Sequence, residues 1–157
     1  MNDGREVIAR LPCPIAFPSR LTVASEVATL GLVQTYGVPV PEILGYSTTT
    51  ANPVGAEYIL MDKAAGEELG ERWFSLPDLD RAKIIGRLSQ IENVLFSIPL
   101  PASGSIFYKR DLDESITSLD ISGTEFCIGP SIEQRWWHGR RGEIKINRGP
   151  CELIPSH

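Results

Sequence analysis

Cysteine is scarce in this sequence, and its spacing excludes two common ways of stabilising a small domain. The three cysteines, Cys13, Cys127 and Cys151, are odd in number, far apart and outside any C-x-x-C pair. Disulfide frameworks use even sets of cysteines, and structural zinc sites use closely spaced pairs. The pattern therefore indicates reduced thiols and no zinc site.

Long apolar segments are also missing. The 157 residues contain no run of 18 apolar residues, which a membrane-spanning helix would need. The first residues, MNDGREVIAR, lack the apolar centre of a signal peptide, and Asp3 and Glu6 are atypical of a transit peptide. We therefore expect an intracellular protein without a membrane span, cytoplasmic or, as the alternative, mitochondrial.

Positive charge is scarce as well. The formal net charge is −5, whereas a protein that binds nucleic acid needs a basic surface. One segment, residues 135–148, is locally basic and aromatic, a pattern that also occurs in single-strand nucleic-acid sites. We interpret it as a surface loop whose tryptophans pack against the protein, with no nucleic-acid partner. Its basic and aromatic residues are Arg135, Trp136, Trp137, His138, Arg140, Arg141, Lys145 and Arg148.

Motifs of several enzyme classes are absent. The sequence has no G-x-S-x-G, H-E-x-x-H or G-x-x-x-x-G-K-[ST] segment, which gives hydrolase and P-loop functions no support. Two acidic groups, Asp111 with Asp113 and Glu114, and Asp62 with Glu67 and Glu68, are interpreted as solvated turns and not as metal sites. We expect no metal ligands in this chain.

The feature that stands out is Glu26. Residues 22–35 have a helical pattern in which Val23, Val27, Leu30 and Val33 share one face, and Glu26 projects from within that face. A buried carboxylate costs several kcal/mol unless a cation pairs with it. Residues 6–11, EVIARL, predict a strand that ends near Arg10. We therefore predict an ion pair, within about 4 Å, between Arg10 on this strand and Glu26 on the helix.

The other expected elements follow from turn residues and periodicity. Ser19 or Thr22 is suited to begin the first helix, and Gly37 to end it. Residues 42–47 and 55–63 predict two strands of a hairpin, with a buried run at 58–61. Residues 75–97 predict a long amphipathic helix capped by Ser75, and residues 104–109 and 143–147 alternate like short strands.

Several segments together resemble one family. In chain order they are VIARLPCP, ASEVATL, YGVPVPEILGYS, NPVGAEYILMDKAAG, GSIFY, FCIGPSIEQRWW and INRGP. They resemble fungal members of the aminoglycoside phosphotransferase and choline kinase-like superfamily, including its altered-inheritance-of-mitochondria type. The resemblance extends from about residue 6 to residue 150 and implies an α+β, protein-kinase-like fold.

The resemblance implies a nucleotide site and a domain order. Arg10 and Glu26 would position ATP phosphates, Met61 would stand behind the adenine, and Asp62, Lys63 and Ala64 would offer backbone contacts to it. ATP and Mg²⁺ would be the cofactors, and a small-molecule hydroxyl the acceptor. The expected domains are a partial small lobe with one antiparallel sheet and one helix (1–63), a hinge and linker (64–74), and the start of the large lobe (75–157), beginning with its first long helix and carrying an insert near the substrate cleft.

The sequence departs from that family in its catalytic part. The family uses an H-x-D-x-x-x-x-N-like loop and a second aspartate for Mg²⁺, but no histidine here has an aspartate two residues later. We therefore expect the N-terminal portion of a phosphotransferase, with no catalytic residue of its own and no activity alone. The alternative is a non-catalytic, pseudokinase-like module that associates with itself or a partner through the apolar stripe of residues 75–97.

Overall fold

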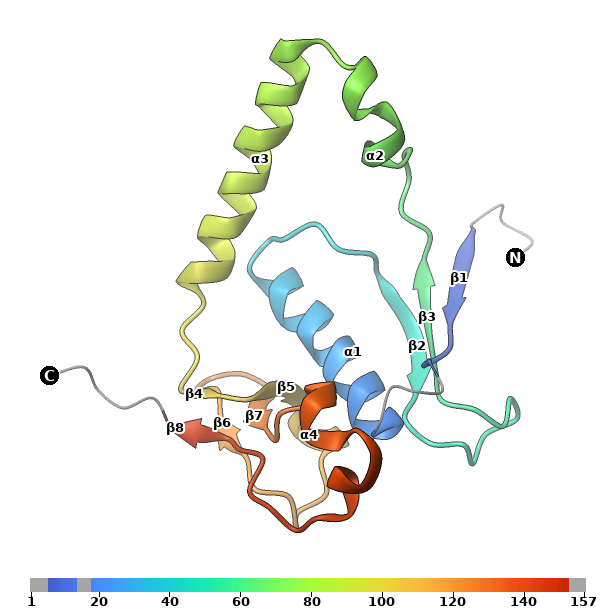
Figure 1. Cartoon of the computed structure of the whole chain (residues 1–157), viewed down its shortest axis with the longest axis vertical. Helices are drawn as coiled ribbons and strands as arrows, with labels where there is room; N and C mark the ends of the chain where they lie inside the picture. Colours follow the sequence, from blue (N-terminus) through green and yellow to red (C-terminus); the bar gives the residue numbers. More distant parts are fainter. Residues whose placement is uncertain (1–5, 14–17, 153–157) are drawn as a thin grey trace, which may run out of the picture.

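One central helix contacts two antiparallel sheets on different faces. The computed structural model describes residues 6–13 and 18–152, so the expected domain limits at residues 1 and 157, and the first half of the segment MNDGREVIAR, lie outside the described residues. Helix α1 (Ser19–Thr35) is central, and α2 with α3 extends away from it as an arch (Figure 1). The structure is α+β.

The first sheet has the order β1-β3-β2 and is antiparallel throughout. Its strands are β1 (Val7–Arg10), β2 (Ile43–Ser47) and β3 (Tyr58–Asp62). The strands predicted at 6–11, 42–47 and 55–63 are therefore all present, and the last two pair directly. The buried run expected at 58–61 is wrong in extent: only Ile59 is fully buried, and the other three residues are half-buried. Side chains alternate along a strand, so Tyr58 and Leu60 lie on the face of the sheet opposite to Ile59.

Helix α1 ends as its sequence predicts but begins differently. Pro18 occupies the N-cap position, so no side chain caps the helix, and Thr22 Oγ1 instead donates a hydrogen bond to Pro18 O at 2.9 Å. At the other end Gly37 has φ of 78°, and its N–H donates to Gln34 O. The N–H of Val38 donates to Val33 O, which completes a Schellman motif.

Two faces of α1 are buried, whereas the sequence indicated one. Val23 and Val27 pack with Ile59 of the first sheet. Small residues on another face, with Leu32, pack against the second sheet, which comprises β5 (Ser105–Tyr108), β6 (Leu119–Asp120) and β7 (Phe126–Gly129) in the order β5-β7-β6. These α1 residues are Ala24, Ala28 and Leu32.

The arch has no comparable core. It consists of α2 (Leu69–Arg72), a 3₁₀ turn, Trp73–Ser75, and α3 (Asp78–Ser97). Pro77, not Ser75, precedes α3 at the N-cap, so the predicted serine cap is wrong. No residue of α3 is buried, and the ribbon stands clear of the sheets (Figure 1). The predicted apolar stripe is therefore partly uncovered: Leu88 and Leu95 are exposed, whereas Ile84 and Ile91 are half-buried.

The last described part of the chain folds beside the second sheet. It contains the two-stranded ribbon of β4 (Ala102–Ser103) and β8 (Cys151–Glu152), the short helix α4 (Gln134–Trp137) and a 3₁₀ segment, Gly139–Glu143. The strand expected at 143–147 is wrong, because this segment follows the 3₁₀ turn without a pairing partner among the described strands. A 3₁₀ helix, Lys109–Asp111, follows β5.

Candidate functional site

Arg10 and Glu26 form an ion pair, as the sequence predicted. Arg10 is the last residue of β1, and its Nη1 contacts Glu26 Oε1 on α1. The carboxylate is less buried than expected: the Glu26 side chain is 24% exposed and that of Arg10 60%. The reason is that β1 lies at the edge of its sheet, so one side of the pair faces solvent. An ion pair this exposed contributes little to stability.

A cavity of about 300 Å³ lies at this ion pair. Its walls come from the end of β1 and the residues after it, from the first turns of α1, and from Ile59 of β3. The lining residues are Arg10, Leu11, Pro12, Cys13, Thr22, Val23, Glu26 and Ile59. The cavity therefore presents one guanidinium and one carboxylate above an apolar floor, an arrangement suited to a polar ligand with an anionic group.

The expected hinge residues lie elsewhere on β3 and after it. Arg10 is paired with Ile59 in the sheet register, whereas Met61 and Asp62 are paired with Ile8 and Val7 at the other end of β1. None of Met61, Asp62, Lys63 and Ala64 lines the cavity at Arg10 and Glu26. The structure thus places the two predicted halves of the nucleotide site at opposite ends of one strand pair.

Two of the expected backbone donors are already engaged. The N–H of Asp62 donates to Glu42 O at 2.9 Å, and that of Lys63 donates to Glu6 O at 3.0 Å. Both bonds arise because β3 is the central strand, with a neighbour on each side. The Lys63 side chain also contacts Glu6, at 3.0 Å. An adenine contact through these two N–H groups would have to replace bonds within the sheet.

The sequence suggested a solvated acidic turn at 111–114, but two of its carboxylates contact other parts of the fold. Asp111 accepts a hydrogen bond of 2.8 Å from Tyr46 Oη on β2. Asp113 forms a bidentate ion pair with Arg20 of α1, with N–O distances of 3.0 and 3.1 Å. These carboxylates tie the turn to the first sheet and to α1. Among the described residues, no group of three or more His, Cys, Asp or Glu side chains is placed to hold a metal ion.

Sequence reasoning missed a second polar cluster beside this turn. The Arg110 guanidinium lies 3.9 Å from the centre of the Tyr108 ring, and its Nη1 contacts Glu125 at 2.8 Å. Burial raises the pKa of the Tyr108 hydroxyl, and burial, opposed by the Arg110 contact, raises that of Tyr46. An aromatic residue next to an arginine and an aspartate, as in FYKRD, is the only sequence signal of this cluster.

Comparisons with known proteins give relatives but no fold. The chain is 45% identical over 155 residues to a subtelomeric hrmA-associated cluster protein of Aspergillus fumigatus, covering 98% of this chain and 30% of that protein. It is 28% identical over 176 residues to the altered inheritance of mitochondria protein 9, mitochondrial, of Yarrowia lipolytica, and 27% identical over 154 residues to that of Candida tropicalis. These two alignments cover 100% and 87% of this chain, and 30% and 25% of the respective proteins.

No family model and no solved structure matches the chain. None of the helices in the described part has the combination of length and apolar composition that would let it span a bilayer. The chain spans about 30% of the length of the curated relatives in Aspergillus fumigatus, and its similarity extends to mitochondrial proteins named for altered inheritance of mitochondria.

Proposed function

We propose that this chain is the nucleotide-positioning part of a kinase-like phosphotransferase, in which Arg10 binds a phosphate group and Glu26 orients Arg10. The observation that carries the proposal is the ion pair itself, made by the end of a strand and the following helix at the wall of a cavity of about 300 Å³. A strand cation paired to a helix glutamate holds the nucleotide phosphates in protein kinases. The resemblance of the surrounding segments to aminoglycoside phosphotransferases supports the same interpretation.

The residues fit part of this chemistry. A guanidinium offers several N–H donors and remains charged at all physiological pH values, so Arg10 can bind a phosphate while one nitrogen stays on Glu26. The described residues offer no carboxylate cluster for Mg²⁺, and we assign no step to that ion here. No histidine of the sequence is followed two residues later by an aspartate. We therefore assign this segment nucleotide binding, and phosphoryl transfer to a small-molecule hydroxyl only to a longer protein that contains it.

Titration with ATP tests the proposal. We expect a Kd in the millimolar range, equivalent to about −4 kcal/mol, because one ion pair and one open cavity supply few contacts. NMR shifts of amides in β1 and in the first turns of α1 would measure it. Arg10→Gln should weaken binding about tenfold, the effect of one charge-assisted hydrogen bond.

Lys109→Gln is the matched control, since Lys109, directly after the end of β5, is also a cation in an exposed ion pair, with Asp120 at 2.9 Å, but lies outside the cavity. If Arg10→Gln and Lys109→Gln bind ATP equally well, the Arg10–Glu26 pair is structural and the proposal is wrong. Micromolar affinity together with turnover by this chain would contradict the assignment of catalysis to a longer protein.

The names of the relatives support a proposal for the location of the full protein. Two of them are named as mitochondrial proteins, and on that similarity we place a full-length protein containing this segment in mitochondria, with the cytoplasm as the alternative. Imaging of the full-length gene product with a C-terminal fluorescent tag distinguishes the two compartments.

A second candidate function is association through α3. The observation that favours it is the uncovered apolar surface of this helix, which includes Leu88, Leu95 and Phe96, the last 89% exposed. Each aliphatic side chain gains about 1.5 to 3 kcal/mol when it is fully buried, so the stripe favours self-association or a partner. We expect sedimentation velocity to show oligomers that the double variant Leu88→Glu/Leu95→Glu disperses.

Val54→Glu, an apolar-to-acidic change in the exposed turn between β2 and β3, is the control and should leave the oligomers intact. A monomeric wild-type chain that the double variant unfolds would show that the stripe is covered within the chain itself.

A further inference from the structure

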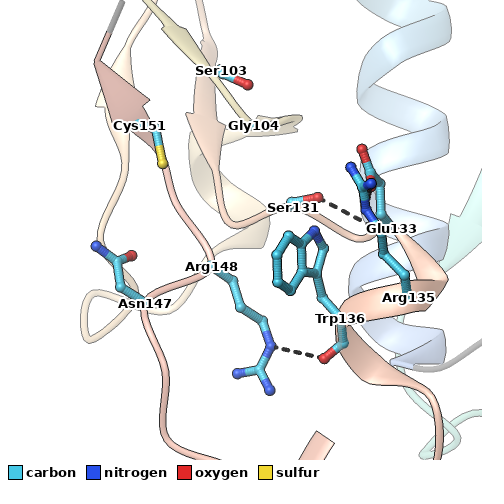
Figure 2. A pocket seen from close by; sticks show the side chains of 9 residues that line it. All are labelled: Ser103, Gly104, Ser131, Glu133, Arg135, Trp136, Asn147, Arg148 and Cys151. Atoms are coloured by element: carbon cyan, nitrogen blue, oxygen red, sulfur yellow. Dashed lines mark hydrogen bonds and ion pairs between the residues drawn. The ribbon is translucent and has the colours of Figure 1, made fainter. Parts of the chain in front are cut away.

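Two neighbouring cavities share the side chains of Arg135 and Trp136, in a part of the fold that contributes no residue to the cavity at Arg10 and Glu26. The first, of about 310 Å³, lies between α4 and the β4–β8 ribbon, and most of the residues that line it carry a polar side chain (Figure 2). These include Ser103, Asn147 and Arg148. The second, of about 320 Å³, is lined by Arg135, Trp136, Arg141, Ile144 and Ile146. A polar and a largely apolar hollow thus meet at one tryptophan.

Trp136 is exposed although its backbone is fixed. The side chain is 42% exposed, and its indole ring stands at the wall of the first cavity (Figure 2). The backbone N–H of Trp136 donates to Glu133 O at 2.9 Å, and the backbone carbonyl of Trp136 accepts from Arg148 Nε at 3.4 Å. Large aromatic side chains held rigidly at the surface are typical of binding sites, because little conformational entropy is lost when a ligand covers them.

Arg148 holds this whole wall in place. Besides the Trp136 carbonyl, its Nη2 donates to the carbonyls of Arg141 at 2.6 Å and Ile144 at 3.1 Å. Its guanidinium also lies 4.0 Å from the ring centre of Trp137, whose Nε1 donates to Ser131 O at 2.8 Å. The segment from 134 to 146 is therefore organised before any ligand arrives. Arg148 covers the ring of Trp137 closely, whereas Trp136 remains exposed and has the Arg135 guanidinium at a greater distance, 5.4 Å from its ring centre.

The charge around these cavities favours an anion. Residues 133–148 contain five Arg and Lys against two Glu, within a chain whose net charge is −5. Arg135 uses its Nε on Glu133, and its guanidinium lies 5.4 Å from the ring centre of Trp136. Its two terminal nitrogens make no hydrogen bond to another residue that the structure describes. A guanidinium in this state offers parallel N–H donors to a carboxylate or phosphate.

We propose that the paired cavities bind a small organic anion with an apolar arm. Its acidic group would lie in the polar cavity at the Arg135 guanidinium, whose terminal nitrogens can donate to it. Its apolar arm would cross the indole of Trp136 into the hollow at Ile144 and Ile146. A nucleic-acid strand fits less well, because stacking of successive bases needs several available aromatic faces and Trp137 is already covered by Arg148.

Titration with 4-phenylbutyrate tests this site, and the indole N–H signals of the three tryptophans report on it. We expect a saturable shift of the Trp136 signal, with those of Trp73 and Trp137 much less affected. The neutral amide of the same acid, and acetate alone, should each bind about tenfold more weakly, because each lacks one of the two recognised parts. Bound 4-phenylbutyrate should also slow alkylation of Cys151, which lines the polar cavity, but not of Cys13.

Arg135→Gln should weaken 4-phenylbutyrate binding about tenfold, and Arg140→Gln, the same charge change on an exposed neighbour outside both cavities, should change it less than twofold. If both variants lose the same affinity for 4-phenylbutyrate, the binding depends only on the general positive charge of this segment, and the proposal is wrong. A short oligonucleotide that shifts the Trp136 signal at lower concentration than 4-phenylbutyrate would overturn it as well. Arg10→Gln should leave binding unchanged, so this test is independent of the proposed nucleotide site.

Discussion

Replacement of Gly31 by alanine is the sharpest test of how α1 sits on the second sheet. A Cβ atom at this position would lie 2.1 Å from Tyr108 Oη and 3.0 Å from Tyr108 Cζ. The tyrosine cannot easily move away, since its ring stacks on Phe126 with ring centres 4.8 Å apart and carries the Arg110 guanidinium at 3.9 Å. An added methyl group in such a packed contact costs about 1 to 3 kcal/mol.

Alanine also favours the helix relative to glycine by up to about 1 kcal/mol, which offsets part of that cost. Gly31→Ala should therefore lower the free energy of unfolding by about 0 to 2 kcal/mol. Gly86→Ala in α3 is the matched control, because a Cβ there meets nothing within 4 Å and only the helix-propensity gain remains. The two variants should differ by about 1 to 3 kcal/mol, the cost of the clash alone.

Urea unfolding followed by circular dichroism measures both variants. Tyr108→Phe, combined with Gly31→Ala, removes the oxygen atom at 2.1 Å and should recover part of the loss. If Gly31→Ala and Gly86→Ala change the unfolding free energy equally, α1 does not approach Tyr108 as closely as described, and the packing argument fails.

Two further predictions concern titratable side chains. Cys13 and Cys151 are exposed and should react with iodoacetamide in the folded chain. Cys127 is buried, and burial raises the pKa of its thiol, so it should react only on unfolding. Mass spectrometry of the labelled chain over time distinguishes the three thiols, and early labelling of Cys127 would contradict its burial. Burial raises the pKa of Tyr46 and Tyr108 above the usual value of about 10. Above that pH the unfolded chain loses protons that the folded chain keeps, so stability should fall as pH rises from 10 through the folded pKa values, and less steeply in Tyr46→Phe, as urea titrations from pH 8 to 11 would show.

The features that the sequence predicted well are those that a local pattern determines. The strand at β1, the end of α1 at Gly37 and the pairing of Arg10 with Glu26 each depend on a short segment or on a charge that demands a partner. The serine caps failed because a proline precedes each helix and takes the N-cap position itself.

The remainder depends on contacts between segments far apart in the chain. Ala24 and Ala28 carry no strong apolar signal, yet they are fully buried because a second sheet comes close to them. The contact between Asp111 and Tyr46 joins residues 65 positions apart, which no periodicity reveals. The position of the expected hinge relative to Arg10 likewise depends on the sheet register.

The burial of α1 on two faces has a consequence for regulation. In protein kinases, outward movement of the helix that carries the paired glutamate breaks the cation–glutamate pair and switches activity. Here such a movement would expose Val27 on one side and Leu32 on the other, at about 1.5 to 3 kcal/mol for each side chain. A state that lies 3 to 6 kcal/mol above the ground state is populated at roughly one per cent or far less. Helix α1 therefore keeps Glu26 beside the end of β1 in the folded chain, and a ligand that controls this site would act on access to the cavity and on the exposed Arg10 side chain, not on the position of the helix.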